Sequence, residues 1–365
     1  MNILIVSGGT GGHIFPAIAL GKELKSRGYN ISFVTNDSIS AVNMIETAGF
    51  NYEVLSVPKM PYGFSINWLI FFPKLLLARY DAEDLIRLLN PNIVVGFGAY
   101  ISGPIVSVAK SNNIKTIIHE QNVSLGRANK ILLKKADKVF LSFSHRLMDK
   151  SKKYIVTGNP LRPSLLEGLK SLTKAQAKAR LGLSRNKKTI LVLGGSRGAP
   201  AINSLIMKVL VELDELQRKR IQIIHVCGKK DLEQVSREYR ISGVEHVVNT
   251  FYETMHIYYK AADLIICRAG ATTASEIAVF GLPAILIPYP WAGYHQKDNA
   301  EAIAGSGGAV VVEENRISPK ELRSEIFDII DNEEKMREMS SSMRSLAKID
   351  AASKMSDQIE ELLNA

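Results

Sequence analysis

Two glycine-rich loops constrain this chain most, because each follows the pattern of a buried strand and precedes that of a helix. The first, Ser7–His13, reads SGGTGGH after the apolar run Ile3–Val6, and the second, Gly194–Ala199, reads GGSRGA after Thr189–Leu193. A strand that turns through glycines into a helix directs backbone N–H groups at one point, which suits a phosphate or another anion. Neither loop continues into the Gly-Lys-Ser/Thr of a Walker loop, and neither fits the dinucleotide fingerprint. Two such loops in matching positions predict twin α/β domains that face each other.

Strand patterns alternate with helix patterns along the whole chain. The strand patterns lack a polar face, which is typical of parallel sheets covered by helices on both sides. We therefore predict an α/β fold of two doubly wound domains, for which 365 residues are sufficient. The expected strands are 3–6, 31–35, 52–56, 93–96, 116–119 and 138–141 in the first half, and 189–193, 222–227, 246–249, 264–267, 284–288 and 309–312 in the second.

Proline and glycine residues between Gly158 and Leu172 indicate a domain boundary. We place the first domain at 1–162 and the second at 163–349, and we expect an amphipathic helix at about 350–365 to pack back on the first domain. Because the chain starts directly with a strand pattern, no secretory signal is expected. Cys227 and Cys267 lie in apolar strand patterns and are interpreted as reduced core thiols.

The positive charge is concentrated in the first part of the chain. Of the net charge of +10, residues 1–160 carry +8, from 18 Lys and Arg against 10 Asp and Glu. Such an excess indicates an acidic partner, which could be nucleic acid, an anionic bilayer surface or a phosphorylated substrate. No basic stretch carries the interleaved aromatic residues of a nucleic-acid platform, so we expect no nucleic-acid partner.

The segment Phe64–Arg79 is unusually apolar, and two interpretations of it stay open. It is too short, and too interrupted by Pro73 and Lys74, to span a bilayer. It is either a kinked helix that faces the core or an apolar surface patch, rimmed by Lys and Arg, that dips into a membrane interface. The residues of the candidate membrane patch are Trp68, Leu69, Phe71, Phe72 and Leu75.

A series of motifs follows in an order that resembles one bacterial family. The motifs are Gly8–Ala17, Gly96–Pro104, His119–Asn122, Gly158–Arg162, Gly194–Ala199, Arg268–Glu276 and His295–Ala300. Together they resemble the MurG family of glycosyltransferase family 28, which transfers N-acetylglucosamine (GlcNAc) from UDP-GlcNAc to the undecaprenyl-pyrophosphoryl-MurNAc-pentapeptide precursor of peptidoglycan. The resemblance covers essentially the whole chain.

This resemblance implies a GT-B fold, in which two Rossmann-like domains flank a cleft. The first domain would bind the lipid acceptor and the second UDP-GlcNAc, without a cofactor, at the cytoplasmic face of the cell membrane. Cell-wall synthesis proteins would be possible partners.

Site residues are also implied by the resemblance. In the Arg268–Glu276 motif, Glu276 would accept hydrogen bonds from the ribose hydroxyls, and the start of the helix would face the diphosphate. The residues implied for UDP-GlcNAc are Thr10, Gly11, Gly12, Asn122, Arg162, Ser196, Tyr252, Ala271, Thr272, Thr273, Glu276 and Gln296, and those for the acceptor are Gly9, Tyr100 and Asn122. Arg197 and Tyr294 depart from the family pattern, in which glutamine and aspartate are common at these positions.

The reaction that the resemblance implies needs a base for the acceptor hydroxyl and charge stabilisation for the departing UDP. His13 is the candidate base, since imidazole exchanges protons near neutral pH, although it could instead bind the acceptor pyrophosphate as a cation. Glu120, at the end of a strand pattern, is the rival base. No Asp-x-Asp ends a strand in either half, so we expect no catalytic metal.

Three other functions remain as alternatives. A glycolipid synthase of similar fold would share the donor half, but not the Gly-Gly-Thr-Gly-Gly-His and His-Glu-Gln-Asn motifs. A UDP-GlcNAc 2-epimerase would need acidic and histidine residues around the sugar C2 and no membrane patch. A non-catalytic nucleotide-sugar sensor would not need His13, Glu120 and Glu276 together.

Overall fold

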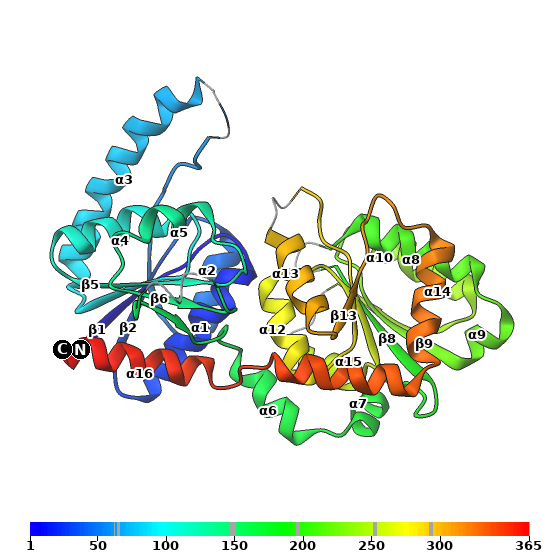
Figure 1. Cartoon of the computed structure of the whole chain (residues 1–365). Coiled ribbons are helices and arrows are strands. Elements are labelled where there is room, and N and C mark those ends of the chain that lie inside the picture. The colour runs from blue at the N-terminus through cyan, green and yellow to red at the C-terminus, as the bar shows by residue number, and fades with distance from the viewer. Residues whose placement is uncertain are drawn as a thin grey trace. The chain divides into compact units, whose positions relative to one another are not determined.

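The computed structural model of the chain describes residues 1–61, 63, 66–145, 151–194, 198–250, 254–291 and 295–364. The chain divides into two compact units, Met1–Arg162 together with Lys348–Ala365, and Pro163–Ala347. Each unit is built on one sheet of parallel strands with helices packed against it (Figure 1). The prediction of two doubly wound α/β domains is therefore confirmed.

The sheet of the first unit has the strand order β3-β2-β1-β4-β5-β6-β7. Its strands are β1 (Asn2–Val6), β2 (Asn30–Thr35), β3 (Asn51–Val54), β4 (Ile93–Gly96), β5 (Lys115–Glu120), β6 (Lys138–Leu141) and β7 (Tyr154–Val156). Its helices are α1 (Gly11–Ser26), α2 (Ile39–Thr47), α3 (Asn67–Leu89), α4 (Ser102–Ser111), α5 (Arg127–Leu132) and α16 (Ala351–Asn364).

Both faces of this sheet are buried, as the apolar strands require. In β1, Leu4 and Val6 join the core beneath α3, α4 and α5, whereas Ile3 and Ile5 join the core beneath α1, α2 and α16. This alternation follows from the two-residue period of a strand. The C-terminal helix α16 packs along α1 and contributes Met355 and Ile359 to the second of these cores.

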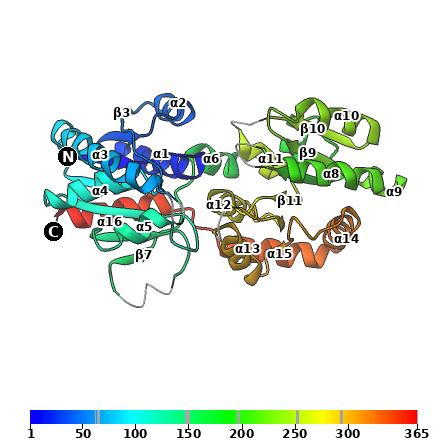
Figure 2. The same cartoon turned by 90° about the horizontal axis from the view of Figure 1, so that it is seen from above.

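The sheet of the second unit has the order β10-β9-β8-β11-β12-β13, which repeats the pattern of the first. Its strands are β8 (Lys188–Leu193), β9 (Ile221–Val226), β10 (Glu245–Asn249), β11 (Leu264–Cys267), β12 (Ala284–Leu286) and β13 (Ala309–Val311). Its helices are α6 (Pro163–Ser171), α7 (Lys174–Arg180), α8 (Pro200–Glu212), α9 (Glu215–Arg220), α10 (Leu232–Ser242), α11 (Met255–Ala261), α12 (Ala271–Phe280), α13 (His295–Gly305), α14 (Pro319–Ile330) and α15 (Glu333–Ser345), most of them visible in Figure 2.

The strand order reverses direction at one point in each sheet. In the first unit this point lies between β1 and β4, and in the second it lies between β8 and β11. In open α/β sheets, ligands bind beyond the carboxyl ends of the strands at such a switch point. Both glycine-rich loops and the starts of α4 and α12 follow the strands at these two positions.

Every expected strand is present, within a few residues of its predicted bounds. The structure adds β7, which has only three half-buried residues at the edge of the sheet and therefore carries no strong apolar signal. Both cysteines are buried and free, as expected.

Candidate functional site

The first glycine loop carries His13 into the first turn of α1. Gly9 has a φ of +90° and its N–H donates to Asn36 Oδ1 over 3.1 Å. A Cβ at Gly8 would lie 2.8 Å from the same oxygen, so the loop requires glycine there. Thr10 is the N-cap of α1, and Gly11 and Gly12 form its first turn with His13. The candidate residues Gly9–His13 are thus gathered at the carboxyl end of β1.

His13 belongs to a hydrogen-bonded series of side chains at the switch point. Its Nδ1 lies 2.9 Å from Gln121 Oε1. Gln121 Nε2 lies 2.9 Å from the Phe97 carbonyl oxygen and 3.0 Å from His119 Nδ1. His119 Nε2 in turn lies 3.1 Å from the Gly158 carbonyl oxygen. Burial lowers the pKa of His119 to about 4, so that its ring is neutral at physiological pH.

Glu120 points away from His13 into the loop that follows β5. Its carboxylate accepts hydrogen bonds from the backbone N–H groups of Asn122 and Gly126, at 3.0 and 2.7 Å. It also accepts from the side-chain amides of Asn122 and Asn129, at 3.1 and 2.8 Å. Glu120 is almost fully buried among these donors. These hydrogen bonds hold the 121–126 loop in place.

The other candidate residues of the first unit lie near this site or pack beside it. Tyr100 follows β4 and is half-buried, after the left-handed turn of Gly98 and Ala99. Arg162 stacks its guanidinium on the ring of Phe15 in α1, with Cζ 4.5 Å from the ring centroid. Asn122 lies beside Glu120, as described above.

The second glycine loop is as tightly packed as the first where it is described. A Cβ at Gly194 would lie 2.4 Å from the Ala199 nitrogen, and one at Gly198 would lie 2.7 Å from the Cys227 oxygen. Ser196 and Arg197 of this loop lie outside the described residues, as do Tyr252 and Tyr294.

Helix α12 supplies the centre of the candidate donor site. It begins at Ala271 after the N-cap residue Gly270, so that Ala271, Thr272 and Thr273 form its first turn. Glu276 lies further along the helix and is only 5% exposed. Its Oε2 accepts a hydrogen bond from the Tyr259 hydroxyl at 2.7 Å, which fixes the carboxylate.

Helix α13 brings Gln296 to the same end of the sheet. Gln296 Oε1 accepts from the Tyr289 N–H at 2.9 Å, so this side chain holds the segment after β12. Asn299, one turn later and fully buried, donates to the Ala269 carbonyl oxygen at 3.0 Å just before α12. Sequence reasoning missed Asn299 and Tyr259, because a single polar residue in a helix carries no signal of its partner.

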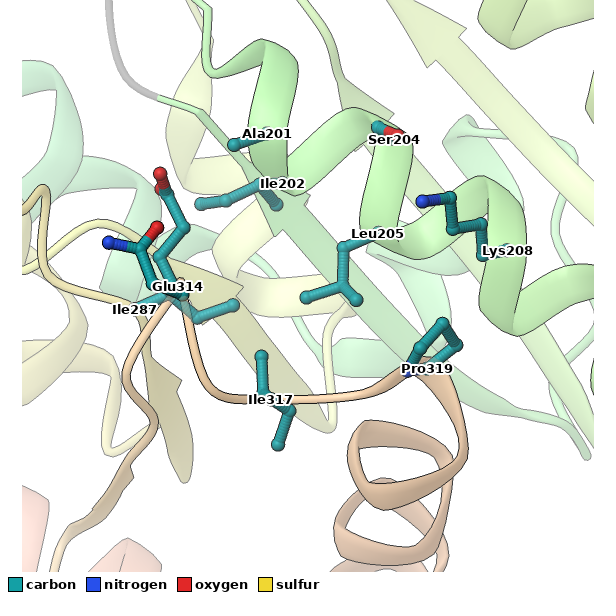
Figure 3. A pocket seen from close by; sticks show the side chains of 10 residues that line it. Ala201, Ile202, Ser204, Leu205, Lys208, Ile287, Glu314, Ile317 and Pro319 are labelled. Atoms are coloured by element: carbon teal, nitrogen blue, oxygen red, sulfur yellow. The ribbon is translucent and has the colours of Figure 1, made fainter.

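A cavity of about 300 Å³ opens beside the start of α8 (Figure 3). It lies between the first turns of α8 and the segment that leads from β13 into α14, with Ile202 on one side and Ile317 on the other. Glu314 lines it and forms an ion pair with Arg268. Arg268 also donates to the Ile287 carbonyl oxygen at 3.0 Å, so it joins the ends of β11 and β12 to this segment. The sequence analysis did not predict this cavity.

Helix α3 exposes a broad apolar face, and in Figure 1 its first turns extend away from the sheet of its unit. Leu69 is 73% and Phe72 56% exposed, whereas Trp68 and Leu75 are half-buried. Phe71 is only 6% exposed and packs edge-on against Trp68, so its assignment to the exposed patch was wrong. We define the α3 patch by its exposed apolar side chains, which are Ile66, Leu69, Ile70, Phe72, Leu76, Leu77 and Tyr80.

The described ranges contain neither a membrane-spanning helix nor a candidate metal centre. No helix in them has the length and apolar character needed to cross a bilayer. No group of three or more His, Cys, Asp or Glu side chains in them could hold a metal ion.

Each of the two units matches a domain of the same known protein family. Residues 3–141 match the glycosyltransferase family 28 N-terminal domain, and residues 189–360 match the C-terminal domain of the same family. The chain belongs to glycosyltransferase family 28.

Relatives of known name within family 28 match the whole length of the chain. A protein of Desulforamulus reducens is 34% identical over 100% of this chain and 99% of its own length. One of Flavobacterium psychrophilum is 36% identical over 100% and 98%. Both carry the name UDP-N-acetylglucosamine--N-acetylmuramyl-(pentapeptide) pyrophosphoryl-undecaprenol N-acetylglucosamine transferase. The crystal structure of MurG from Acinetobacter baumannii superposes with a TM-score of 0.79 at 27% identity, covering 99% of both chains.

Proposed function

We propose that this protein transfers GlcNAc from UDP-GlcNAc to the 4-hydroxyl of MurNAc in undecaprenyl-pyrophosphoryl-MurNAc-pentapeptide, which converts lipid I into lipid II in peptidoglycan synthesis. The observation that carries this proposal is the match, along the full chain, to relatives that all bear the name of this transferase. A glycolipid synthase, an epimerase and a sensor have no comparable support.

In this proposal the acceptor half of the chemistry belongs to the first unit. His13 Nε2 takes the proton of the MurNAc 4-hydroxyl, the oxygen attacks C1 of GlcNAc, and the bond from C1 to UDP breaks with the electron pair leaving on UDP. A single displacement of this kind inverts the configuration at C1. Glu120 positions the loop that carries Asn122 rather than exchanging a proton.

The donor half belongs to the second unit. In this proposal the diphosphate lies at the start of α12, Ala271–Thr273, where the positive end of the helix stabilises the negative charge that develops on UDP. Glu276, held by Tyr259, accepts from the ribose hydroxyls. Gln296 contacts the sugar in the same proposal, and its contact with Tyr289 N–H orients it.

The α3 patch is proposed to attach the protein to the cytoplasmic face of the cell membrane. A lipid-linked acceptor stays in the bilayer, so the enzyme must reach the membrane surface. Exposed apolar side chains on α3 insert into the interface, and the exposed basic residues Lys59, Lys74 and Arg79 meet anionic headgroups. The net +8 of residues 1–160 acts in the same direction.

The test is transfer from UDP-GlcNAc to a short-chain lipid I analogue, followed by UDP release and by detection of the disaccharide product. His13→Ala should lower kcat by about 100-fold or more, in line with general-base contributions, while UDP binding measured by calorimetry stays intact. A protein that binds UDP-GlcNAc but forms no disaccharide would contradict the proposed function. An equal loss of UDP affinity in His13→Ala would instead make His13 a donor ligand.

A further inference from the structure

The hydrogen-bonded series of His13, Gln121 and His119 ends at the carbonyl oxygens of Phe97 and Gly158. A carbonyl oxygen can only accept a hydrogen bond, so these two ends determine the direction of each bond within the series. We infer that Gln121, oriented by His119, is a positioning residue that keeps the proton of neutral His13 on Nδ1 and leaves Nε2 as the proton acceptor. This inference rests on the proposed function for its catalytic meaning, but the proton position is a property of the protein alone.

The first step fixes the orientation of the Gln121 amide. Its Nε2 lies 2.9 Å from the Phe97 carbonyl oxygen, which accepts only, so an N–H of the amide must point there. The opposite amide orientation would place two acceptor oxygens against each other. Gln121 Oε1 therefore faces His13, at 2.9 Å from Nδ1.

The second step fixes the proton of His119. Its Nε2 lies 3.1 Å from the Gly158 carbonyl oxygen, which only accepts, so Nε2 carries the proton. The Ser142 hydroxyl, whose Oγ lies 3.3 Å from the same Nε2, then acts as a second acceptor. The ring is neutral because it is buried, and its Nδ1 is consequently a lone-pair acceptor. Nδ1 lies 3.0 Å from Gln121 Nε2 and accepts the second N–H of the amide. Both N–H groups of Gln121 are thus directed away from His13.

The third step concerns His13 itself. Gln121 Oε1 only accepts, so His13 Nδ1 must donate to it, and Nε2 of the neutral ring then carries the lone pair. Gly98 lies beside this contact, since a Cβ there would be in ordinary van der Waals contact with His13 Cε1, at 3.5 Å, and with Gln121 Oε1, at 3.6 Å. Its φ of +80° favours glycine at this position.

The arrangement differs from a His–carboxylate pair, because a neutral amide orients the imidazole. Glu120 carries the carboxylate next to Gln121 in the sequence, and this carboxylate accepts hydrogen bonds from Asn122, Gly126 and Asn129. When the acceptor hydroxyl gives its proton to Nε2, the Nδ1 proton stays in its bond to Gln121. Product release then returns the Nε2 proton to water.

The proton position is measured by NMR of the full chain labelled with ¹⁵N in histidine, in the absence of substrates and above pH 7. Two-bond couplings between the ring nitrogens and the protons on the ring carbons distinguish a protonated Nδ1 from a protonated Nε2. The spectrum of the His13→Gln variant assigns the signal to His13. We expect His13 to carry its proton on Nδ1 and His119 on Nε2. A wild-type spectrum with the His13 proton on Nε2 would overturn the inference without any variant of Gln121.

Gln121→Met tests the role of the amide, since methionine has a similar length and volume but no acceptor oxygen. We expect the His13 proton to redistribute toward Nε2 and kcat to fall at least about tenfold, as for other partners that orient a catalytic histidine. The KM for UDP-GlcNAc should stay the same. An unchanged His13 signal in folded Gln121→Met would contradict the inference.

Gln222→Met is the matched control. Gln222 is also buried, although it lies within β9 whereas Gln121 directly follows β5; it donates to the Ser184 carbonyl oxygen and Thr189 Oγ1, and accepts from the Ser184 N–H. The Gln222→Met variant therefore loses as many hydrogen bonds as the Gln121→Met variant, but it loses them in the second unit. We expect it to lower thermal stability without moving the His13 signal or kcat, and an equal fall in kcat would reduce Gln121 to a structural role.

These measurements separate the inference from the proposed function. If His13 carries its proton on Nδ1 but the protein forms no disaccharide, the inferred role of Gln121 is supported and the proposed transferase activity is contradicted. If His13 carries its proton on Nε2 in a protein that forms the disaccharide, the inferred role of Gln121 is contradicted and the proposed activity is supported.

Discussion

Replacing two exposed residues of the α3 patch, Leu69→Ser with Phe72→Ser, should weaken membrane binding strongly while leaving the fold intact. Full burial of a Leu or Phe side chain contributes about 1.5–3 kcal/mol. Leu69 is 73% and Phe72 56% exposed, so inserting this exposed surface into a bilayer interface contributes about 2–4 kcal/mol for the pair. A loss of that size raises the dissociation constant by about 30- to 1,000-fold.

The assay is co-sedimentation with liposomes that contain anionic lipids, at low and at high salt. Salt should weaken wild-type binding further, since Lys74 and Arg79 flank the patch and their attraction to headgroups is screened. Turnover of a short-chain acceptor that needs no membrane should be unchanged in the double variant.

Phe71→Ser is the matched control on the same helix. Phe71 is buried against Trp68, so its loss should destabilise the first unit by about 3–5 kcal/mol, as for other large core residues. The double variant at Leu69 and Phe72 should instead keep its thermal midpoint. If it binds liposomes as tightly as wild type, or melts like Phe71→Ser, the reasoning from exposure is refuted.

Three further outcomes are expected. Glu276→Ala should raise the KM for UDP-GlcNAc about 10- to 100-fold through the loss of charge-assisted hydrogen bonds, with Tyr259→Phe having a smaller effect, and an unchanged KM in a folded variant would remove Glu276 from the site. A chelator should leave kcat unchanged in a transfer assay, whereas loss of activity that Mg²⁺ restores would show that a metal is required. Burial lowers the pKa of His119 to about 4 and that of His225 to about 3. The unfolded chain binds protons at both residues near pH 6.5, so the urea midpoint should fall between pH 7 and pH 5.5, and a rise would contradict this.

The architecture could be predicted because its sequence signals are local and because the same signals occur in both units. Each glycine loop sits between a strand and a helix, and the strands are apolar on both faces since helices cover both. Tyr154–Val156 escaped prediction, because a three-residue edge strand is defined by its pairing with β6 rather than by its composition. The cavity beside α8 was not predicted either, since its lining joins residues of α8 to Glu314–Pro319, which lie more than 100 residues later in the chain.

Within α3, composition identified an apolar segment but not which of its residues face solvent. Phe71 and Phe72 are adjacent, and the helix turns about 100° between them, so one is buried and the other exposed. The sequence around Pro73 is apolar on all sides and shows no stripe from which the buried face could be read.

The site motif His119–Asn122 shows the same limit at the level of chemistry. Sequence reasoning ranked Glu120 as a rival base because a carboxylate at a strand end is a common catalytic group. Side chains alternate across a strand, so His119 and Gln121 point to one side and Glu120 to the other. The side that contains His13 thus holds an amide and a neutral imidazole, whereas the carboxylate accepts from three N–H donors of its own loop and from the Asn129 amide of α5. Which side faces His13 depends on the pairing of β5 with β4, a contact that no local pattern encodes. The residue types of the motif therefore predict catalysis, but only the packed sheet shows that Gln121 contacts His13 and that Glu120 contacts Asn122, Gly126 and Asn129.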